Sequence, residues 1–206
     1  MTEQGTAEWH ADRLGKVTAS RIADVMMKPT TAGYQNYRAQ LVCERLTGIP
    51  TDGFTSAAMQ HGTDTEPQAR AFYEMEFGVD VQQVGFIPHP SIEMAGASPD
   101  GLVGNVGLVE IKCPQPATHI RTLLGDSIDR KYDLQMRWQM ICTGREWCDF
   151  ISFCPSLPLE MQMADERVFH DPTKAEEITA AVVAFLADVD EMTAELSKRY
   201  QKKDAA

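Results

Sequence analysis

The sequence lacks what a secreted, membrane-spanning or disordered protein would need. It has only five cysteines, an odd number without any Cys-x-x-Cys pair, so a disulfide framework is not predicted. No apolar run approaches the ~18 residues of a membrane span, and residues 1–12 contain no apolar stretch that a signal peptide would require. With 43% hydrophobic and 24% charged residues, intrinsic disorder is excluded. We therefore expect a cytoplasmic protein without membrane contact.

Basic charge is also scarce, with 19 Lys and Arg residues against 30 Asp and Glu residues and a net charge of −11. This balance argues against a simple basic surface for nucleic acid. It leaves room for a site in which carboxylates hold metal ions and only a local patch is basic. The 206 residues suit one domain over 1–206, with frayed ends at about 1–7 and 201–206.

Apolar periodicity and Gly or Pro boundaries predict an alternation of helices and strands. The predicted helices cover 18–27, 35–47, 63–77, 130–143 and 172–203. The predicted strands cover 84–88, 93–103, 108–113, 147–154 and 160–169. In the third helix, Pro67 suits the first turn, and Phe72, Met75 and Phe77 would face the core. The order indicates an α/β fold with a mixed central sheet flanked by helices.

The most informative stretch is Ser-Pro-Asp-Gly at 98–101, followed by Leu-Val-Glu-Ile-Lys at 108–112. Strand side chains alternate between two faces. Glu110 and Lys112 therefore share one face, which we expect to border a cleft, while Val109 and Ile111 share the other and pack on the core. On more ordinary interpretations, Pro-Asp-Gly is a turn and Glu-x-Lys lies on a solvated face.

The register of this predicted hairpin decides whether its carboxylates meet. Asp100 and Glu110 lie on the same face if Val103 pairs with Gly107 across a three-residue loop at 104–106. A two-residue turn would place them on opposite faces. We predict the odd-length loop, or a bulge with the same effect.

Two carboxylates and a lysine suit phosphodiester hydrolysis. Oxygen ligands select Mg²⁺, which binds substrate phosphate and lowers the pKa of a bound water. Lys112 can orient that water and offset developing negative charge, and the main-chain carbonyl of Ile111 can add a ligand. Glu66 is a third candidate carboxylate; otherwise it is a first-turn glutamate paired with Arg70.

Four blocks of the sequence resemble one known family. They are WHADRLGKVTAS at 9–20, GTDTEPQAR at 62–70, ASPDG at 97–101 with EIKCP at 110–114, and LQMRWQMICT at 134–143. Together they are similar to the viral recombinase nucleases of the bacteriophage lambda exonuclease type, which have a restriction-endonuclease-like PD-(D/E)xK core.

The resemblance implies a Mg²⁺-dependent, processive 5′→3′ exonuclease on linear double-stranded DNA in a bacterial or phage-infected cytoplasm. Such an enzyme releases 5′-mononucleotides and leaves a 3′-ended strand for a single-strand annealing protein. The resemblance also implies a homotrimeric ring. An endonuclease with the same core, and a catalytically idle protein that binds DNA ends, remain the alternatives.

The resemblance also implies roles for individual residues in the reaction. Two Mg²⁺ ions, for which Mn²⁺ substitutes, would be held by Asp100, Glu110 and the carbonyl of Ile111. Lys112 would handle the attacking water and Gln135 would help to position it. Glu66 would support the metal directly or through water.

A second set of residues matches the family's contacts to the DNA end. Arg13, Ser20 and Ser98 would hold the 5′-phosphate, because an arginine fork and hydroxyl donors make a good phosphate site. Met59 would wedge into the duplex end. The alternatives are a surface ion pair for Arg13, a helix cap for Ser20, a turn for Ser98 and core packing for Met59.

One departure from the family is the absence of an arginine after Lys28-Pro29, where this chain has Thr30. An acidic ring could still hold DNA if basic residues lined its channel. The candidates for that lining are Arg13, Lys16, Arg21, Lys28 and Lys112.

Overall fold

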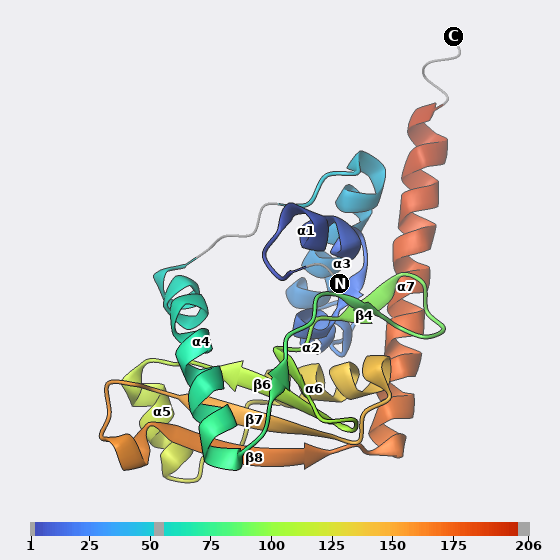
Figure 1. Ribbon diagram of the computed structural model, residues 1–206. Coiled ribbons are helices and arrows are strands. Elements are labelled where there is room, and N and C mark those ends of the chain that lie inside the picture. Colours follow the sequence, from blue (N-terminus) through green and yellow to red (C-terminus); the bar gives the residue numbers. More distant parts are fainter. Residues whose placement is uncertain (1–2, 52–55, 202–206) are drawn as a thin grey trace.

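The computed structural model describes residues 3–51 and 56–201 (Figure 1). The helices are α1 Ala7–Arg13, α2 Ile22–Val25, α3 Ala32–Thr47, α4 Ala57–Phe77, α5 Pro116–Leu123, α6 Arg130–Thr143 and α7 Pro172–Gln201, with 3₁₀ helices η1 Ala19–Arg21 and η2 Leu159–Met161. The strands are β1 Val17–Thr18, β2 Val81–Gln82, β3 Ile87–Pro88, β4 Ala95–Ala97, β5 Gly101–Val103, β6 Gly107–Lys112, β7 Trp147–Phe153 and β8 Met163–Phe169.

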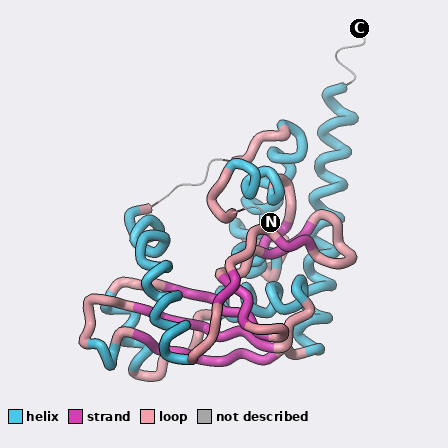
Figure 2. The backbone as a smooth tube through the Cα atoms, in the orientation of Figure 1, coloured by secondary structure: helices cyan, strands magenta, loops and turns pink. Residues whose placement is uncertain are grey.

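The larger sheet has the strand order β2-β5-β6-β7-β8, and only β6 and β7 run parallel. Helix α4 crosses one face of this sheet and α6 covers the other (Figures 1 and 2). A smaller sheet, β1-β4-β3, lies above it and is also mixed. The fold is therefore α/β with mixed sheets flanked by helices, as the sequence predicted.

Side chains along β6 alternate between two apolar clusters, as the period of a strand requires. Val109 and Ile111 pack against Ala69 and Tyr73 of α4. Leu108, on the opposite face, packs with a cluster that includes residues of α6, namely Met136 and Met140. The predicted division of this strand into two faces is confirmed.

The long helix α7 closes a third cluster together with α2, α3 and α6. Phe185 is completely buried and contacts the rings of Tyr34 and Tyr37 at centroid distances of 4.9 and 5.3 Å. The apolar residues that recur at helical spacing along α7 are all buried: Ile178, Val182, Phe185, Leu186 and Val189. This cluster fixes the N-terminal segment against the rest of the fold.

The register of the β5–β6 hairpin is the one that the chemistry required. Val103 pairs with Gly107, and Gly101 pairs with Val109. The intervening loop is three residues long, and Gly104 begins it at φ +52°, in the left-handed region that glycine adopts without strain. The expected odd-length loop is confirmed.

Several predicted elements are wrong in extent. The helix expected at 18–27 is divided into β1, η1 and α2. The strand expected at 93–103 is interrupted around Pro99, whose ring nitrogen cannot donate to a ladder, and its two halves enter different sheets. Short elements that the sequence analysis did not predict are α1, α5 and β2.

Helix α4 begins at Ala57 rather than at residue 63. Ser56 caps it, because its hydroxyl accepts a hydrogen bond from the Met59 N–H at 3.1 Å. Pro67 therefore lies inside the helix and not in its first turn. Of the residues predicted to face the core, Phe72 packs against the cluster that contains Tyr73, whereas Met75 and Phe77 are 71% and 42% exposed.

A frayed N-terminus is expected at about residues 1–7, and the structure describes residues 3–7 of that range. The side chain of Gln4 donates to the carbonyls of Val84 and Pro99, each at 2.9 Å. Residues 202–206 of the predicted C-terminal fray lie outside the described residues. Among the helices described, none combines the length and apolar character needed to cross a bilayer.

Candidate functional site

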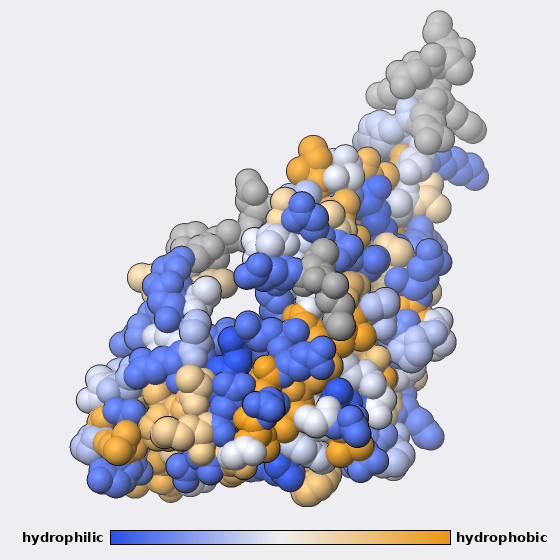
Figure 3. All heavy atoms as spheres, viewed as in Figure 1, coloured by the Kyte–Doolittle hydropathy of each residue, from blue (hydrophilic) through white to orange (hydrophobic). Residues whose placement is uncertain are grey.

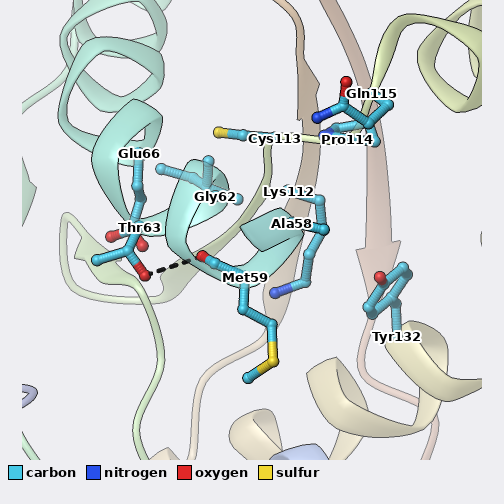
Figure 4. A pocket seen from close by; sticks show the side chains of 11 residues that line it. Ala58, Met59, Gly62, Thr63, Glu66, Lys112, Cys113, Pro114, Gln115 and Tyr132 are labelled. Carbon is cyan, nitrogen blue, oxygen red and sulfur yellow. Dashed lines mark hydrogen bonds between the residues drawn. The ribbon is translucent and has the colours of Figure 1, made fainter. Parts of the chain in front are cut away.

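A cleft of about 540 Å³ opens between α4 and the end of β6 (Figure 4). Lys112 extends from β6 toward the space between Met59 and Tyr132 in this view. The cleft is lined by Ala58, Met59, Gly62, Thr63, Glu66, Ile111, Lys112, Cys113, Pro114, Gln115 and Tyr132. Two of the predicted site residues with charged side chains, Glu66 and Lys112, thus reach it from different elements.

Asp100 stands just before β5, one step beyond the Gly101–Val109 pair. Its Oδ2 accepts a hydrogen bond from the Ile111 N–H at 2.7 Å. This contact closes the open end of the hairpin and fixes the carboxylate beside Glu110. The structure therefore brings together the two carboxylates that the motif singled out.

Glu110 is completely buried beneath the cleft. Its Oε1 accepts from Gln135 Nε2 at 2.6 Å and forms an ion pair with Lys112 Nζ, while its Oε2 accepts from Gln139 Nε2 at 2.6 Å. The expectation that Glu110 would face the cleft is wrong, because two amides and an ammonium enclose it. Only Lys112 of the pair lines the opening.

Gln139 was missed by the sequence analysis. It is completely buried, and it lies four residues after Gln135 on α6, so both amides project from the same side of the helix. The signal that could have identified Gln139 was the four-residue spacing of two glutamines on a helix opposite the strand that carries Glu110. The Oε1 of Gln139 has no hydrogen-bond partner among the described residues.

The electrostatics of the site are those of crowded carboxylates around one cation. Burial and the nearby Glu110 carboxylate raise the pKa of Asp100 to about 8. Burial lowers the pKa of Lys112, but the carboxylates of Glu110 and Asp100 outweigh it and raise that pKa above its usual range. Lys112 is therefore an ammonium at neutral pH, suited to donating hydrogen bonds.

From the sequence, Glu66 is either a carboxylate of the site or a first-turn glutamate paired with Arg70. The structure supports a position near the site together with the pair. Its Oε1 accepts from Arg70 Nη2 at 2.6 Å, so the predicted ion pair with Arg70 is confirmed. The first-turn interpretation is wrong, because α4 begins nine residues earlier, at Ala57. Its carboxylate also helps to raise the pKa of Asp100, which places the charge of Glu66 within reach of that carboxyl group.

The donor set suits a hard divalent cation. Within residues 3–51 and 56–201, no three His, Cys, Asp or Glu side chains are grouped closely enough to enclose a metal. Mg²⁺ does not need such a cage, since one or two carboxylates, waters and substrate phosphates commonly hold it. Asp100, Glu110 and the Ile111 carbonyl supply hard oxygen atoms, and crowded negative charge favours a cation there.

The electrostatics predict how stability depends on pH when metal is absent. Between about pH 4 and pH 8 the folded protein keeps a proton on Asp100 that the unfolded chain has released. The free energy of unfolding therefore falls as pH rises through this interval, by at most about 1.4 kcal/mol per pH unit from this group. Urea unfolding in EDTA at pH 6 and pH 8 measures the slope.

Asp100→Asn should remove that part of the slope, because an amide does not titrate. Mg²⁺ should also stabilise the wild type more at pH 8 than at pH 6, since the cation and the proton compete for the same carboxylates. An equal pH slope in the two proteins would show that Asp100 is not the titrating group.

A second cavity, of about 500 Å³, lies beside the first, and Met59 lines both. Figure 3 shows a hollow between α4 and the N-terminal helices, bordered below by a band of hydrophilic residues. The second cavity is lined by Trp9, His10, Arg13, Leu14, Lys16, Thr18, Ser20, Arg21, Tyr37, Gln40, Leu41, Glu44, Pro50, Thr51 and Met59. Three of the five candidate basic residues are among them.

Arg13 lies with its guanidinium carbon 3.8 Å from the centroid of the Trp9 ring. In the part of the chain that the structure describes, no carboxylate forms an ion pair with this guanidinium, so the surface-pair interpretation is not supported. Arg21, in contrast, pairs with Asp24 at 2.6 Å. Lys28 is exposed and lines neither cavity.

Ser20 and Ser98 reach the second cavity differently. Ser20 is exposed within η1 and lines the cavity directly. It is not a helix cap, because Thr18 stands at the start of η1 and Arg21 at the start of α2. Ser98 is connected to the cavity through Trp9, whose Nε1 donates to its hydroxyl at 3.0 Å.

Met59 stands in the first turn of α4, between the two cavities, and is 58% exposed. The core-packing interpretation of this residue is therefore wrong. An exposed apolar side chain at the junction of the two cavities is available to contact a ligand that enters both.

Comparison with known proteins supports the resemblance seen in the four sequence blocks. Two crystal structures of the alkaline exonuclease LHK-Exo from Laribacter hongkongensis, one in complex with dAMP, are 50% identical to this chain, with TM-scores of 0.91 over 96% of this chain and 99% of that one. A phage-related exonuclease of Haemophilus somnus shares the fold at 14% identity and a TM-score of 0.73, over 88% and 96% of the two chains.

A curated relative is an uncharacterized protein of Acanthamoeba polyphaga mimivirus, 28% identical over 162 residues. The match covers 72% of this chain but only 29% of the viral protein. A family model described as the YqaJ-like viral recombinase domain matches residues 8–146. Because this match spans well over half of the chain, the protein belongs to the family of YqaJ-like viral recombinase domains.

Proposed function

We propose that the protein is a Mg²⁺-dependent exonuclease that degrades one strand of linear double-stranded DNA from its 5′ end. The observation that carries this proposal is the meeting of Asp100, Glu110 and Lys112 at the end of β6, where Lys112 lines an open cleft. The 50% identical relative is an alkaline exonuclease, crystallised with a nucleoside monophosphate of the kind that this reaction would release.

In the proposed reaction, Asp100, Glu110 and the Ile111 carbonyl would hold the metal. A pair of Mg²⁺ ions bound there would polarise the phosphate and lower the pKa of a bound water. Lys112, kept cationic by its two acidic neighbours, donates to the attacking water and offsets negative charge on the phosphate oxygens. Gln135 donates to Glu110 and so orients it, and it would help to position the water, while Glu66 supports the site from α4.

The second cavity supports the proposed 5′→3′ direction. Arg13, Ser20 and Ser98 would bind the 5′-phosphate, since a guanidinium fork and hydroxyl donors suit an anion. Met59, which lines both cavities, would separate the end of that strand from its complement.

We further propose that the active form is a homotrimeric ring. Enclosure of the duplex would give processivity that a net charge of −11 does not. The basic side chains at the two cavities would line the path of the DNA. The remaining 3′-ended strand would pass to a single-strand annealing protein for recombination.

The test compares linear and covalently closed circular duplexes of the same sequence in Mg²⁺. The proposal expects complete loss of one strand from linear DNA and no change in the circle. Cutting of the circle would replace the proposal with an endonuclease. Tight binding of linear ends without any cleavage would replace it with an end-binding protein.

The phosphate site predicts a preference for phosphorylated ends that depends on Arg13. Arg13→Ala should lower the ratio of initial rates on 5′-phosphate and 5′-hydroxyl ends about 10-fold or more, because a charged hydrogen bond is worth about 1.5–3 kcal/mol. Lys28→Ala, an exposed cation outside both cavities, is the matched control and should leave the ratio unchanged. An unchanged ratio in Arg13→Ala would place the phosphate elsewhere.

A further inference from the structure

We propose that Trp9 is a positioning residue that holds two phosphate ligands, Arg13 and Ser98, in a single arrangement and thereby sets the preference for a phosphate monoester at the 5′ end. This inference rests on the proposed function and deepens it. Trp9 is not one of the predicted site residues, yet it contacts both Arg13 and Ser98.

The first contact is with Arg13, four residues later in α1, on the same side of the helix. The guanidinium lies 3.8 Å from the indole centroid, a cation–π distance. A stacked guanidinium keeps its N–H donors in its own plane, directed away from the ring. Trp9 thus fixes the orientation of the Arg13 fork without consuming its donors.

The second contact joins segments 89 residues apart, since Trp9 Nε1 donates to Ser98 Oγ at 3.0 Å. An indole N–H is a donor only, so the Ser98 oxygen accepts and its own proton stays available. A hydroxyl held in this way can donate to an anion. The indole therefore settles the orientation of both ligands with two different groups, its ring and its N–H.

The same contact relates the two cavities to each other. Ser98 precedes Asp100 by two residues, on the segment that joins β4 to β5. Trp9 therefore ties α1, which carries the phosphate-binding arginine, to the backbone that carries a proposed metal ligand. A terminal phosphate held by Arg13 and Ser98 is placed at a set distance from the carboxylates.

The test separates the ring from the N–H. Trp9→Phe keeps an aromatic ring under Arg13 but cannot donate to Ser98. We expect the ratio of rates on 5′-phosphate and 5′-hydroxyl ends to fall about 5-fold, the value of one ordinary hydrogen bond. The ratio is the readout, because a general structural defect would lower both rates by the same factor and leave their ratio unchanged.

A double-mutant cycle identifies the route of the effect. If Trp9 acts through Ser98, Trp9→Phe should not lower the ratio further in a Ser98→Ala background. Trp147→Phe is the matched control, because that indole also stacks on an arginine, Arg167, outside both cavities. An unchanged ratio in Trp9→Phe, or an equal fall in Trp147→Phe, would overturn the inference.

Binding in EDTA separates this inference from the proposed function. Fluorescence anisotropy with a short duplex, bearing either a 5′-phosphate or a 5′-hydroxyl, reports end recognition without cleavage. A phosphate preference in the wild type that weakens in Trp9→Phe supports the role of Trp9 even if no cleavage is found with Mg²⁺. Absence of any phosphate preference in the wild type would overturn the inference whether or not the protein cleaves DNA.

Discussion

Replacing Lys112 with alanine is expected to lower the rate of strand degradation about 10²–10³-fold. The ammonium lines the cleft, and its ion pair with the buried Glu110 keeps it charged. Without it, no group described in the cleft supplies the same positive charge next to the two acids. Single-turnover rates on linear duplex DNA in Mg²⁺ measure the loss.

The matched control is Lys131→Ala, one turn of α6 away from Gln135. Lys131 lies over the Tyr132 ring, with its Nζ 4.6 Å from the ring centroid. It does not line the cleft. Its removal should change the rate less than about twofold. If Lys112→Ala retained a third of the wild-type rate, the lysine would have a structural role only.

Asp100→Asn is expected to abolish both activity and metal-induced stabilisation. The substitution keeps a group of the same shape that can still accept from the Ile111 N–H, but it removes the negative charge a cation requires. The rate should fall at least about 10³-fold, and the heat of Mg²⁺ binding should disappear from a calorimetric titration.

The control for this substitution is Asp126→Asn. Asp126 is an exposed carboxylate that pairs with Arg121 beyond the end of α5, away from the cleft. Its loss should alter neither quantity. Metal binding of wild-type strength in Asp100→Asn would exclude Asp100 as a ligand, and the site would then have to be built around Glu66 and Glu110.

The hairpin that carries the site could be predicted in detail because the side-chain period of a strand allows few solutions. Once Asp100 and Glu110 had to share a face, the pairing of Val103 with Gly107, or a bulge with the same effect, was required, and the structure has that pairing. The apolar residues of α7 were predictable for a similar reason, since their spacing marks one buried side of a helix.

Features that depend on long-range contacts could not be predicted in this way. The start of α4 is a separate case, because the Ser56 cap is local but the short apolar pattern after residue 63 concealed it. The burial of Glu110 follows from two glutamines on α6 that close over it. The bond between Trp9 and Ser98 joins distant segments, and no local pattern marks it.

The division of the predicted strand at 93–103 has a local cause that is present in the sequence itself. Pro99 cannot donate to a ladder, so β4 and β5 separate there and enter different sheets. This break places Ser98 and Asp100 in the connection between the two sheets. The residues around an interrupted strand are thereby free to take up functional positions.

The most direct test of metal-dependent degradation from the 5′ end uses a linear duplex with one radiolabelled 5′-phosphate, incubated with the protein in Mg²⁺ or in EDTA. We predict that labelled mononucleotide is released from the first turnover in Mg²⁺ and not in EDTA, while the complementary 3′-ended strand stays intact. Labelled fragments of intermediate length as the first products, or release of label in EDTA, would contradict a metal-dependent exonuclease that begins at the 5′ end.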